Sequence, residues 1–169
     1  MAVTLAELNA LDRAGFVALL GAVYEHSPWV AEDAWPARPF ASIAGLQTAL
    51  QDAVLAAPPA RQLALLCAHP ELLGKLAAAE LTQASRAEQA SAGLDRCTVE
   101  QRSRMQALNQ AYRARFGFPF IVAVRGLDWA GVIARIEARL AHQPGHETGV
   151  ALHEVGRIAE FRVADLLRP

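Results

Sequence analysis

The sequence predicts an all-α fold, a single-domain bundle of about eight helices with mixed crossing angles. Apolar residues recur at intervals of three and four, for example at Ile43, Leu46, Leu50 and Val54, and this spacing places them along one face of a helix. Residues that favour the N-cap position precede several such stretches. No stretch alternates apolar and polar residues as a half-buried strand does. We therefore expect residues 1–169 to form one helical domain.

The first third of the chain carries start signals for three helices. Thr4 and Glu7 have the spacing of a capping box, in which each side chain binds a free backbone N–H of the first turn. Asp12 is a second N-cap residue, and Ser42 precedes the apolar stripe that ends at Val54. These signals predict two short helices and one longer helix.

The region between residues 27 and 40 has a different composition. Pro28, Pro36 and Pro39 interrupt it, and proline inside a helix removes a hydrogen bond and clashes with the preceding turn. The same region contains two tryptophans and Phe40, which supply large apolar surfaces. The sequence therefore predicts an ordered, packed loop here.

One helix is expected before His69 and another after it. The proline pair at residues 58–59 favours the first turn of a helix, and Pro70 disfavours the helical conformation at His69, so the helix should end there. The next helix is expected to open with Ser85. Glu88 follows three residues later, as the carboxylate of a capping box would.

A long helix and an apolar run follow. Thr98 and Gln101 form another capping box, which opens a helix of roughly 18 residues with its end at Gly117. Residues 118–124 are a short apolar run, and such runs do not distinguish strand from helix. We expect this run to be extended.

Two helices complete the prediction. Asp128 caps the first of them, and the Pro144-Gly145 pair ends it. The last helix is expected from about Glu147 to Leu167. Arg162 lies on its buried stripe, because it follows apolar positions by four and seven residues.

Composition excludes several classes of function. The chain is 53% hydrophobic and 20% charged, with a formal charge of -1 at pH 7, as in an ordinary globular protein. It lacks the basic excess of a nucleic-acid-binding protein and the ~18 uninterrupted apolar residues of a membrane span. Because no secretory signal pattern is present, we expect a cytoplasmic protein without a nucleic-acid or membrane partner.

Three polar side chains are candidates for chemistry, because the helical pattern directs them inward or to a helix end: His69, Glu88 and Arg162. A histidine beside a carboxylate can transfer protons near neutral pH, and arginine can bind a carboxylate through two parallel hydrogen bonds. Each residue also has a structural interpretation. His69 could be a core residue, Glu88 a helix cap, and Arg162 the partner of a buried carboxylate.

Other residues give weaker signals. His142, His146 and His153 occur close together, but a proline between the first two disrupts the helix that would align their rings on a metal ion. Cys67 precedes His69 by two residues, so on a helix the two side chains point in different directions. Glycine-rich phosphate loops and the G-x-S-x-G pattern are also missing from the sequence. We expect no metal site and no cofactor.

Several motifs occur in a fixed order along the chain: Tyr24-Glu25-His26-Ser27-Pro28-Trp29-Val30 with Arg38-Pro39-Phe40, His69-Pro70-Glu71-Leu72 with Gly74-Lys75, Ser85 to Gln89 followed by Ala92-Gly93-Leu94, Leu108-Asn109 with Tyr112, and Phe116-Gly117-Phe118-Pro119-Phe120-Ile121. In these motifs the sequence resembles the 2-oxo-4-hydroxy-4-carboxy-5-ureidoimidazoline (OHCU) decarboxylases, along nearly its whole length. The resemblance implies a cofactor-free carboxy-lyase that converts OHCU to (S)-allantoin in urate degradation.

The resemblance also implies roles for individual residues. The catalytic residues would be His69, Glu88 and Arg162, with the histidine as the acid and the arginine near the substrate carboxylate. The substrate-binding residues would be Pro70, Ser85, Arg86, Gln89, Phe120, Ile121, Val122, Ala123 and Val124. Members of this family are commonly homodimers, so a homodimer is expected.

Two alternatives stay open at this point. A helical binding module without catalytic activity could keep the same scaffold, although the presence of His69, Glu88 and Gln89 argues against it. A hydrolase acting on a ureido ring would instead use Glu88 to activate water. The products distinguish the two enzymes, because only the decarboxylase releases carbon dioxide and forms an optically active product.

Overall fold

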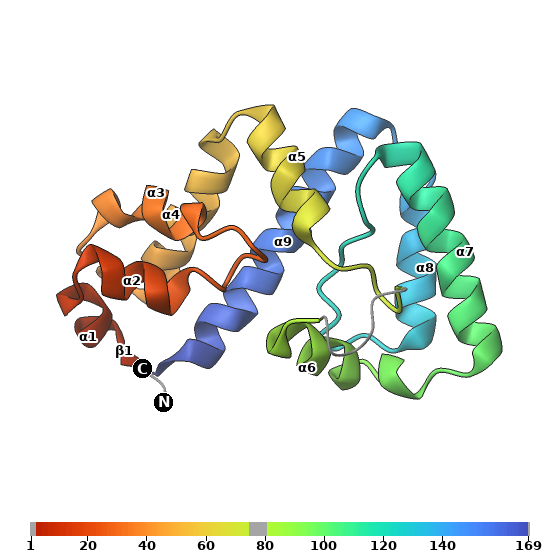
Figure 1. The fold of residues 1–169 in the computed structure, drawn as a ribbon, viewed down its shortest axis with the longest axis horizontal. Coiled ribbons are helices and arrows are strands. Elements are labelled where there is room, and N and C mark those ends of the chain that lie inside the picture. Colours follow the sequence, from red (N-terminus) through yellow and green to blue (C-terminus); the bar gives the residue numbers. More distant parts are fainter. Residues whose placement is uncertain (1–2, 75–80, 169) are drawn as a thin grey trace. The chain divides into compact units, whose positions relative to one another are not determined.

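Nine α-helices account for most of the part of the chain that the structure describes, residues 3–74 and 81–168 of a computed structural model (Figure 1). Two 3-10 helices and one pair of two-residue strands are the other regular elements of these ranges, and turns and loops connect them. The predicted all-α class is confirmed. The residues divide into two compact units: the first extends to Ala68 and resumes at Val155, and the second is His69–Glu154. Within the described ranges, no helix has both the length and the apolar character that a membrane crossing requires.

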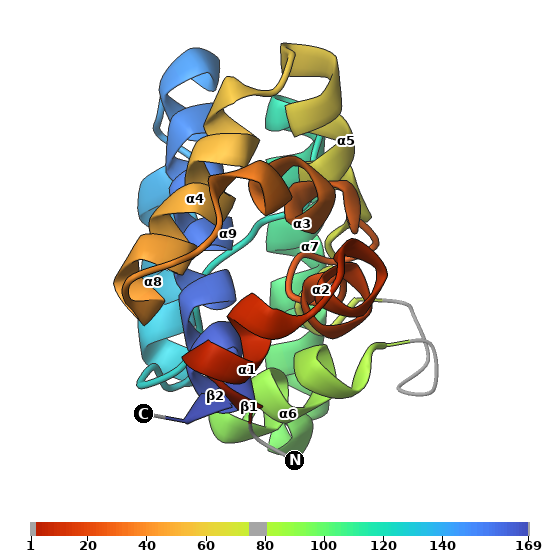
Figure 2. The ribbon, with the colours of Figure 1, turned by 90° about the vertical axis from the view of Figure 1, so that its left-hand side faces the viewer.

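The first unit contains five whole helices and the C-terminal part of a sixth. They are α1 (Leu5–Ala10), α2 (Arg13–Leu20), α3 (Trp29–Ala34), α4 (Ile43–Ala56), α5 (Pro59–Ala68) and the portion of α9 (Pro144–Leu166) from Val155 onward. Their inward faces form an apolar core in which Leu8, Phe16, Leu46, Leu50, Val54 and Val163 are at most 1% exposed. Strands β1 (Val3–Thr4) and β2 (Leu167–Arg168) pair in parallel and join two segments that are far apart in sequence (Figure 2).

Helices of this unit begin at the predicted caps. The Thr4 side chain accepts the N–H of Glu7, and the Glu7 carboxylate accepts the N–H of Thr4 at 2.7 Å. Asp12 and Ser42 each accept the backbone N–H three residues further along. These bonds satisfy N–H groups that have no partner inside the helix. The predicted starts of α1, α2 and α4 are therefore confirmed.

The loop predicted between residues 27 and 40 is wrong in part. Trp29–Ala34 forms α3, and Trp35–Ala37 forms the 3-10 helix η1. Pro28 stands at the N-cap of α3 and Pro36 lies in the first turn of η1, where the missing N–H removes no intrahelical bond. The predicted packing is confirmed, because aromatic rings of this region contact the phenylalanine ring of α2.

The second unit surrounds a cluster of aromatic rings. Its elements are α6 (Gln83–Ser91), the 3-10 helix η2 (Leu94–Arg96), α7 (Val99–Phe116), α8 (Trp129–Arg139) and the part of α9 before Val155. The Tyr112 ring of α7 lies 4.7, 5.9 and 5.3 Å, between centroids, from the rings of Phe116, Phe118 and Phe120. Helix α7 also packs against α8 (Figure 1).

The predicted start of α6 at Ser85 is wrong. Helix α6 begins at Gln83, and Thr82 is its N-cap. The Thr82 hydroxyl accepts the Ser85 N–H at 3.2 Å, so Ser85 is the third residue of the helix. Threonine and serine are both good caps, and the threonine closer to the N-terminus takes the position here.

The start of α9 also differs from the prediction. Helix α9 begins at Pro144 and not near Glu147, because proline fits the first turn of a helix. The caps at Thr98 and Asp128 are confirmed, and Gly117 ends α7 in the left-handed conformation with φ of 82°. Residues 118–124 form neither helix nor strand.

Candidate functional site

His69 is the first residue after α5 and the first of the second unit. Its side chain is 8% exposed, whereas Cys67 is exposed. The predicted helix end and the predicted separation of these two side chains are both confirmed. Pro70, another predicted site residue, follows and is half-buried.

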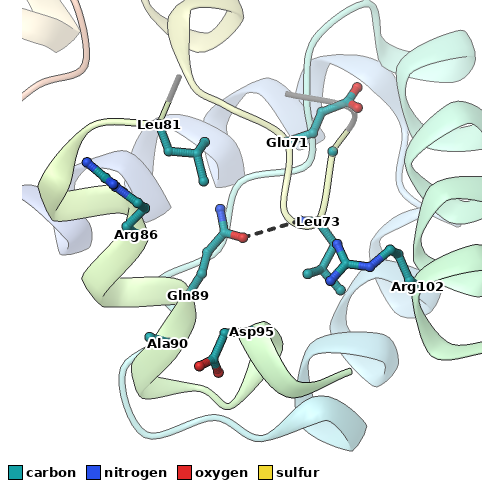
Figure 3. A pocket seen from close by; sticks show the side chains of 9 residues that line it. Glu71, Leu73, Leu81, Arg86, Gln89, Ala90, Asp95 and Arg102 are labelled. Carbon is teal, nitrogen blue, oxygen red and sulfur yellow. Dashed lines mark hydrogen bonds between the residues drawn. The ribbon is translucent and has the colours of Figure 1, made fainter. Parts of the chain in front are cut away.

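The turn after His69 is fixed by side chains of two helices. Asn109 of α7 donates its amide to the Leu72 carbonyl at 2.8 Å. Gln89 of α6 accepts the Leu73 N–H at 3.3 Å (Figure 3). Leu73 has φ of 51°, a left-handed conformation that is uncommon for a residue with a side chain. These two hydrogen bonds hold the strained turn in place.

Helix α6 presents three predicted site residues on one side. Ser85, Glu88 and Gln89 have i, i+3, i+4 spacing, which brings their side chains to one face. Ser85 and Gln89 are 4% and 8% exposed, and Glu88 is half-buried. Arg86 is exposed. Because Thr82 caps the helix and Glu88 is its sixth residue, the capping interpretation of Glu88 is wrong.

A cavity of about 210 Å³ adjoins this helix within the second unit (Figure 3). Two predicted substrate-binding residues line it, Arg86 and Gln89, whereas His69 and Glu88 do not. Its lining carries both charge signs. The residues are Glu71, Leu73, Gly74, Leu81, Arg86, Gln89, Ala90, Asp95 and Arg102.

The predicted substrate-lining segment after α7 is deeply buried. Its exposures range from 1% to 4% over Phe120, Ile121, Val122, Ala123 and Val124. Buried backbone groups need hydrogen-bond partners, and this segment has no helix or strand to supply them. Side chains supply two of them: Arg139 binds the Ile121 carbonyl at 2.6 Å, and Glu154 accepts the Ala123 N–H at 2.7 Å.

Arg162 belongs to the first unit. It is 6% exposed, as the sequence predicts, and its guanidinium pairs with the carboxylate of Glu25 at 3.0 Å. It also donates to the Val23 carbonyl at 3.2 Å. The structural interpretation of Arg162, pairing with a buried carboxylate, is thus confirmed. Its binding of a substrate carboxylate stays a prediction.

Sequence reasoning did not identify the buried charged side chains that support the backbone of residues 120–124. Arg139, Glu147 and Glu154 are 6%, 0% and 7% exposed. A signal for Arg139 was present, because it follows the buried Val132 and Ile136 by seven and three residues and so shares their face of α8. No comparable pattern marks which carboxylates pair with it.

Comparison with known proteins assigns the family. The sequence profile of OHCU decarboxylase matches residues 9–164. This chain belongs to the OHCU decarboxylase family. A 2-oxo-4-hydroxy-4-carboxy-5-ureidoimidazoline decarboxylase of Haloferax volcanii is 46% identical over 162 residues, which are 96% of this chain and 95% of the relative.

Two solved structures share the fold of this OHCU decarboxylase family member. The crystal structure of an (S)-allantoin synthase matches with a TM-score of 0.79 at 32% identity, over 98% of this chain. This chain covers 54% of that synthase chain, or about half its length. An OHCU decarboxylase crystallised in the presence of (S)-allantoin matches with a TM-score of 0.70 at 20% identity, over 92% of this chain and 98% of that one.

Within this family member, the predicted site residues are divided between the two units. All of them except Arg162 belong to the second unit, His69–Glu154. They come from the two residues that follow α5, from α6 and from the buried segment before α8.

Proposed function

We propose that this chain catalyses the decarboxylation of OHCU to (S)-allantoin in urate degradation, with His69 as the acid that sets the product's handedness. The observation that carries the activity is the family match over residues 9–164, together with the 46% identity to an OHCU decarboxylase over nearly the full length of both chains. The burial of His69 at a helix end supports the role of this residue.

The substrate's own structure makes a cofactor unnecessary for this reaction. The departing carboxylate is bonded to a carbon beside a ring C=N bond. When the C–C bond breaks and carbon dioxide leaves, its electron pair forms a C=C bond and the C=N pair moves to nitrogen, which takes up a proton. The ring thus serves as the electron acceptor that a cofactor supplies in other decarboxylases.

Protonation of the resulting enol-like intermediate sets the stereocentre. A proton must add to one face of the carbon that belonged to the C=N bond, while the neighbouring hydroxyl loses its proton and becomes a carbonyl. We assign the proton donation to His69, and such a positioned acid typically contributes about 10²- to 10⁴-fold. Glu88 is assigned to orient the imidazole or the substrate hydroxyl, since no helix cap requires it.

Recognition of the ring is assigned to α6 and to the buried segment after α7. The substrate has urea-like edges that alternate N–H donors with carbonyl acceptors. Ser85 and Gln89 offer a hydroxyl and an amide, which match both kinds of group. The backbone of residues 120–124 offers further donors and acceptors of fixed direction. Arg162 is expected to bind the carboxylate before it leaves.

The test is a stereochemical assay on freshly generated OHCU. Because this substrate also loses carbon dioxide without an enzyme and gives racemic product, the circular dichroism of the allantoin is followed over time. The wild-type protein is expected to give the (S) enantiomer. His69→Ala should give racemic product at the uncatalysed rate while its far-ultraviolet spectrum stays helical, and the exposed His153 offers a matched control, His153→Ala, with unchanged activity.

Two outcomes would contradict the proposal. Undiminished (S)-allantoin formation by His69→Ala would remove the acid role from this residue. Ring opening by the wild-type protein without carbon dioxide release would replace the decarboxylase with a hydrolase.

We also propose that the protein is a homodimer, which sedimentation velocity of the wild-type protein would decide.

A further inference from the structure

A buried stretch of irregular backbone needs side chains to fix its direction. Ile121, Val122 and Ala123 are 2%, 3% and 3% exposed, and they lie outside helices and strands. Regular hydrogen-bond ladders therefore do not orient their peptide groups. Two buried charged side chains contact this stretch, one from α8 and one from α9.

Arg139 of α8 is the first of these side chains. Its Nη1 donates to the Ile121 carbonyl at 2.6 Å, and its Nε donates to Glu147 at 2.7 Å. Its guanidinium also lies 4.7 Å from the centroid of the Phe120 ring. A planar guanidinium donates in fixed directions, so each contact restricts the others.

Glu147 holds Arg139 in this orientation. One of its carboxylate oxygens accepts from both Arg139 and the Tyr112 hydroxyl, and the other is 2.7 Å from Nδ1 of His142. A fully buried carboxylate is costly unless several donors satisfy it. Burial and the hydrogen bond to Glu147 also raise the pKa of Tyr112, which keeps its hydroxyl protonated as a donor.

Glu154 of α9 is the second side chain. It is 7% exposed, and its Oε2 accepts the Ala123 N–H at 2.7 Å. A charged acceptor makes this bond stronger than a bond between neutral groups.

These two contacts determine where the backbone N–H and carbonyl of Val122 point. The Ile121 carbonyl shares a planar peptide with the Val122 N–H, and the Ala123 N–H shares the next one with the Val122 carbonyl. In a trans peptide the C=O and the N–H point in opposite directions, and both of these peptides are trans. The Val122 N–H therefore points away from Arg139, and the Val122 carbonyl points away from Glu154.

We propose that Arg139 and Glu154 are positioning residues, which fix the N–H and carbonyl of Val122 as a donor and acceptor pair for the ureido edge of the substrate. A urea group offers the complementary carbonyl and N–H. This inference rests on the proposed function. The two residues are not assigned a contact with substrate. They fix the direction of the peptide groups that contact it.

The experiment compares two substitutions at Glu154 that both remove its charge. Glu154→Gln keeps a carbonyl acceptor for the Ala123 N–H, whereas Glu154→Leu does not. Glu154→Leu is expected to raise KM about 10-fold with kcat within about twofold, because a positioned backbone group binds substrate and transition state alike. Glu154→Gln should keep KM within about twofold of the wild-type value. Equal KM values for the two variants would overturn the proposal.

A second pair of measurements does not depend on Glu154→Leu folding. Arg139→Lys keeps a positive charge for Glu147, but one ammonium cannot reproduce three directed contacts, so KM should again rise about 10-fold. Amide hydrogen exchange of Ala123 in the wild-type protein should be slow. An unprotected Ala123 amide, or an Arg139→Lys variant with wild-type KM, would refute the positioning role.

The failure of the proposed function is distinguishable from the failure of this inference. A wild-type protein that forms no (S)-allantoin would disprove the reaction. Amide exchange would then still decide whether Glu154 holds the Ala123 peptide, because faster exchange in Glu154→Leu than in Glu154→Gln requires no substrate. Equal exchange in those two variants would contradict the inference whatever the activity.

Discussion

Glu88 is a residue for which a structural and a catalytic role can be separated by experiment. Thr82 caps α6, so replacing the Glu88 carboxylate should leave the helix intact. We expect Glu88→Gln to lower kcat for (S)-allantoin formation about 100-fold or more, because an oriented proton-transfer group is lost. Its melting temperature should match that of the wild-type protein.

Thr82→Ala is the matched control for this prediction. Loss of an N-cap costs about 1 kcal/mol of folding stability, and urea unfolding would measure it. We expect this variant to keep its kcat. If Glu88→Gln instead lowered stability and left kcat unchanged, Glu88 would have a structural role only.

Arg162, unlike Glu88, has an observed structural role, because it pairs with a buried carboxylate. The Arg162–Glu25 pair is 7% and 1% exposed at its side chains. Arg162→Met leaves the carboxylate of Glu25 without this guanidinium, so we expect a loss of about 3–5 kcal/mol in the free energy of unfolding. Chemical denaturation would measure this loss.

A double variant tests whether Arg162 also binds substrate. Arg162→Met with Glu25→Met removes both charges, and such replacements are often neutral for stability. If the double variant folds as stably as the wild-type protein but binds OHCU more weakly, the arginine contributes to binding. Recovery of full activity would leave Arg162 as a structural residue.

At the scale of single elements, local chemistry predicted most helix starts. The caps at Thr4, Asp12, Ser42, Thr98 and Asp128 are confirmed. Each depends on a side chain and an N–H only a few residues apart, so the sequence contains all the information. The apolar spacing likewise placed His69 and Arg162 in buried positions.

The errors at this scale have two causes. Proline predicts a break in a helix, yet Pro28 and Pro144 stand at helix starts. A missing N–H is harmful inside a helix and harmless in its first turn. The predicted start of α6 is wrong because Thr82 and Ser85 compete as caps. Their local sequence does not show which of them is the better cap.

Alanine substitutions at two separate glycines test how α7 ends. Gly117 has φ of 82°, and a Cβ there would meet no atom within 4 Å, so only the backbone conformation opposes a side chain. We expect Gly117→Ala to cost about 1–2 kcal/mol. Gly149 lies inside α9 with equally open surroundings. Gly149→Ala should raise stability by about 1 kcal/mol. Equal effects in urea unfolding would contradict this explanation.

At the scale of the whole molecule, each unit contains a buried tyrosine whose pKa is raised above its ordinary 10.0. For Tyr24 and Tyr112 alike, burial is the main cause. The folded state therefore holds these protons more tightly than the unfolded state. This contribution to stability is complete below pH 10 and is lost as pH rises, by about 1.4 kcal/mol per pH unit for each tyrosine.

Urea unfolding between pH 9 and pH 12 would check this alkaline loss. Tyr24→Phe should reduce its slope, since one of the two titrating groups is removed. The Tyr24 hydroxyl makes a long contact of 3.4 Å to Gln51, so the variant should stay folded at neutral pH. A slope equal to that of the wild-type protein would exclude Tyr24 as a source.

Contacts between distant parts of the chain were beyond prediction from sequence. Arg162 pairs with Glu25, 137 residues away, and Arg139 binds the Ile121 carbonyl, 18 residues away. No local spacing encodes such pairs, because they form only when helices pack. The candidate residues of the site could be named from motifs, but the charges that support their backbone could not.

The pairing of β1 with β2 has a consequence for synthesis. The first unit needs residues 155–168 to complete its core, whereas the second unit is one continuous stretch. A ribosome releases the chain in order, at about 5–20 residues per second. Residues 3–68 therefore emerge before the segment that covers them, and all of the second unit emerges before residue 155. During translation, we expect holdase chaperones to bind residues 3–68 in preference to residues 81–154.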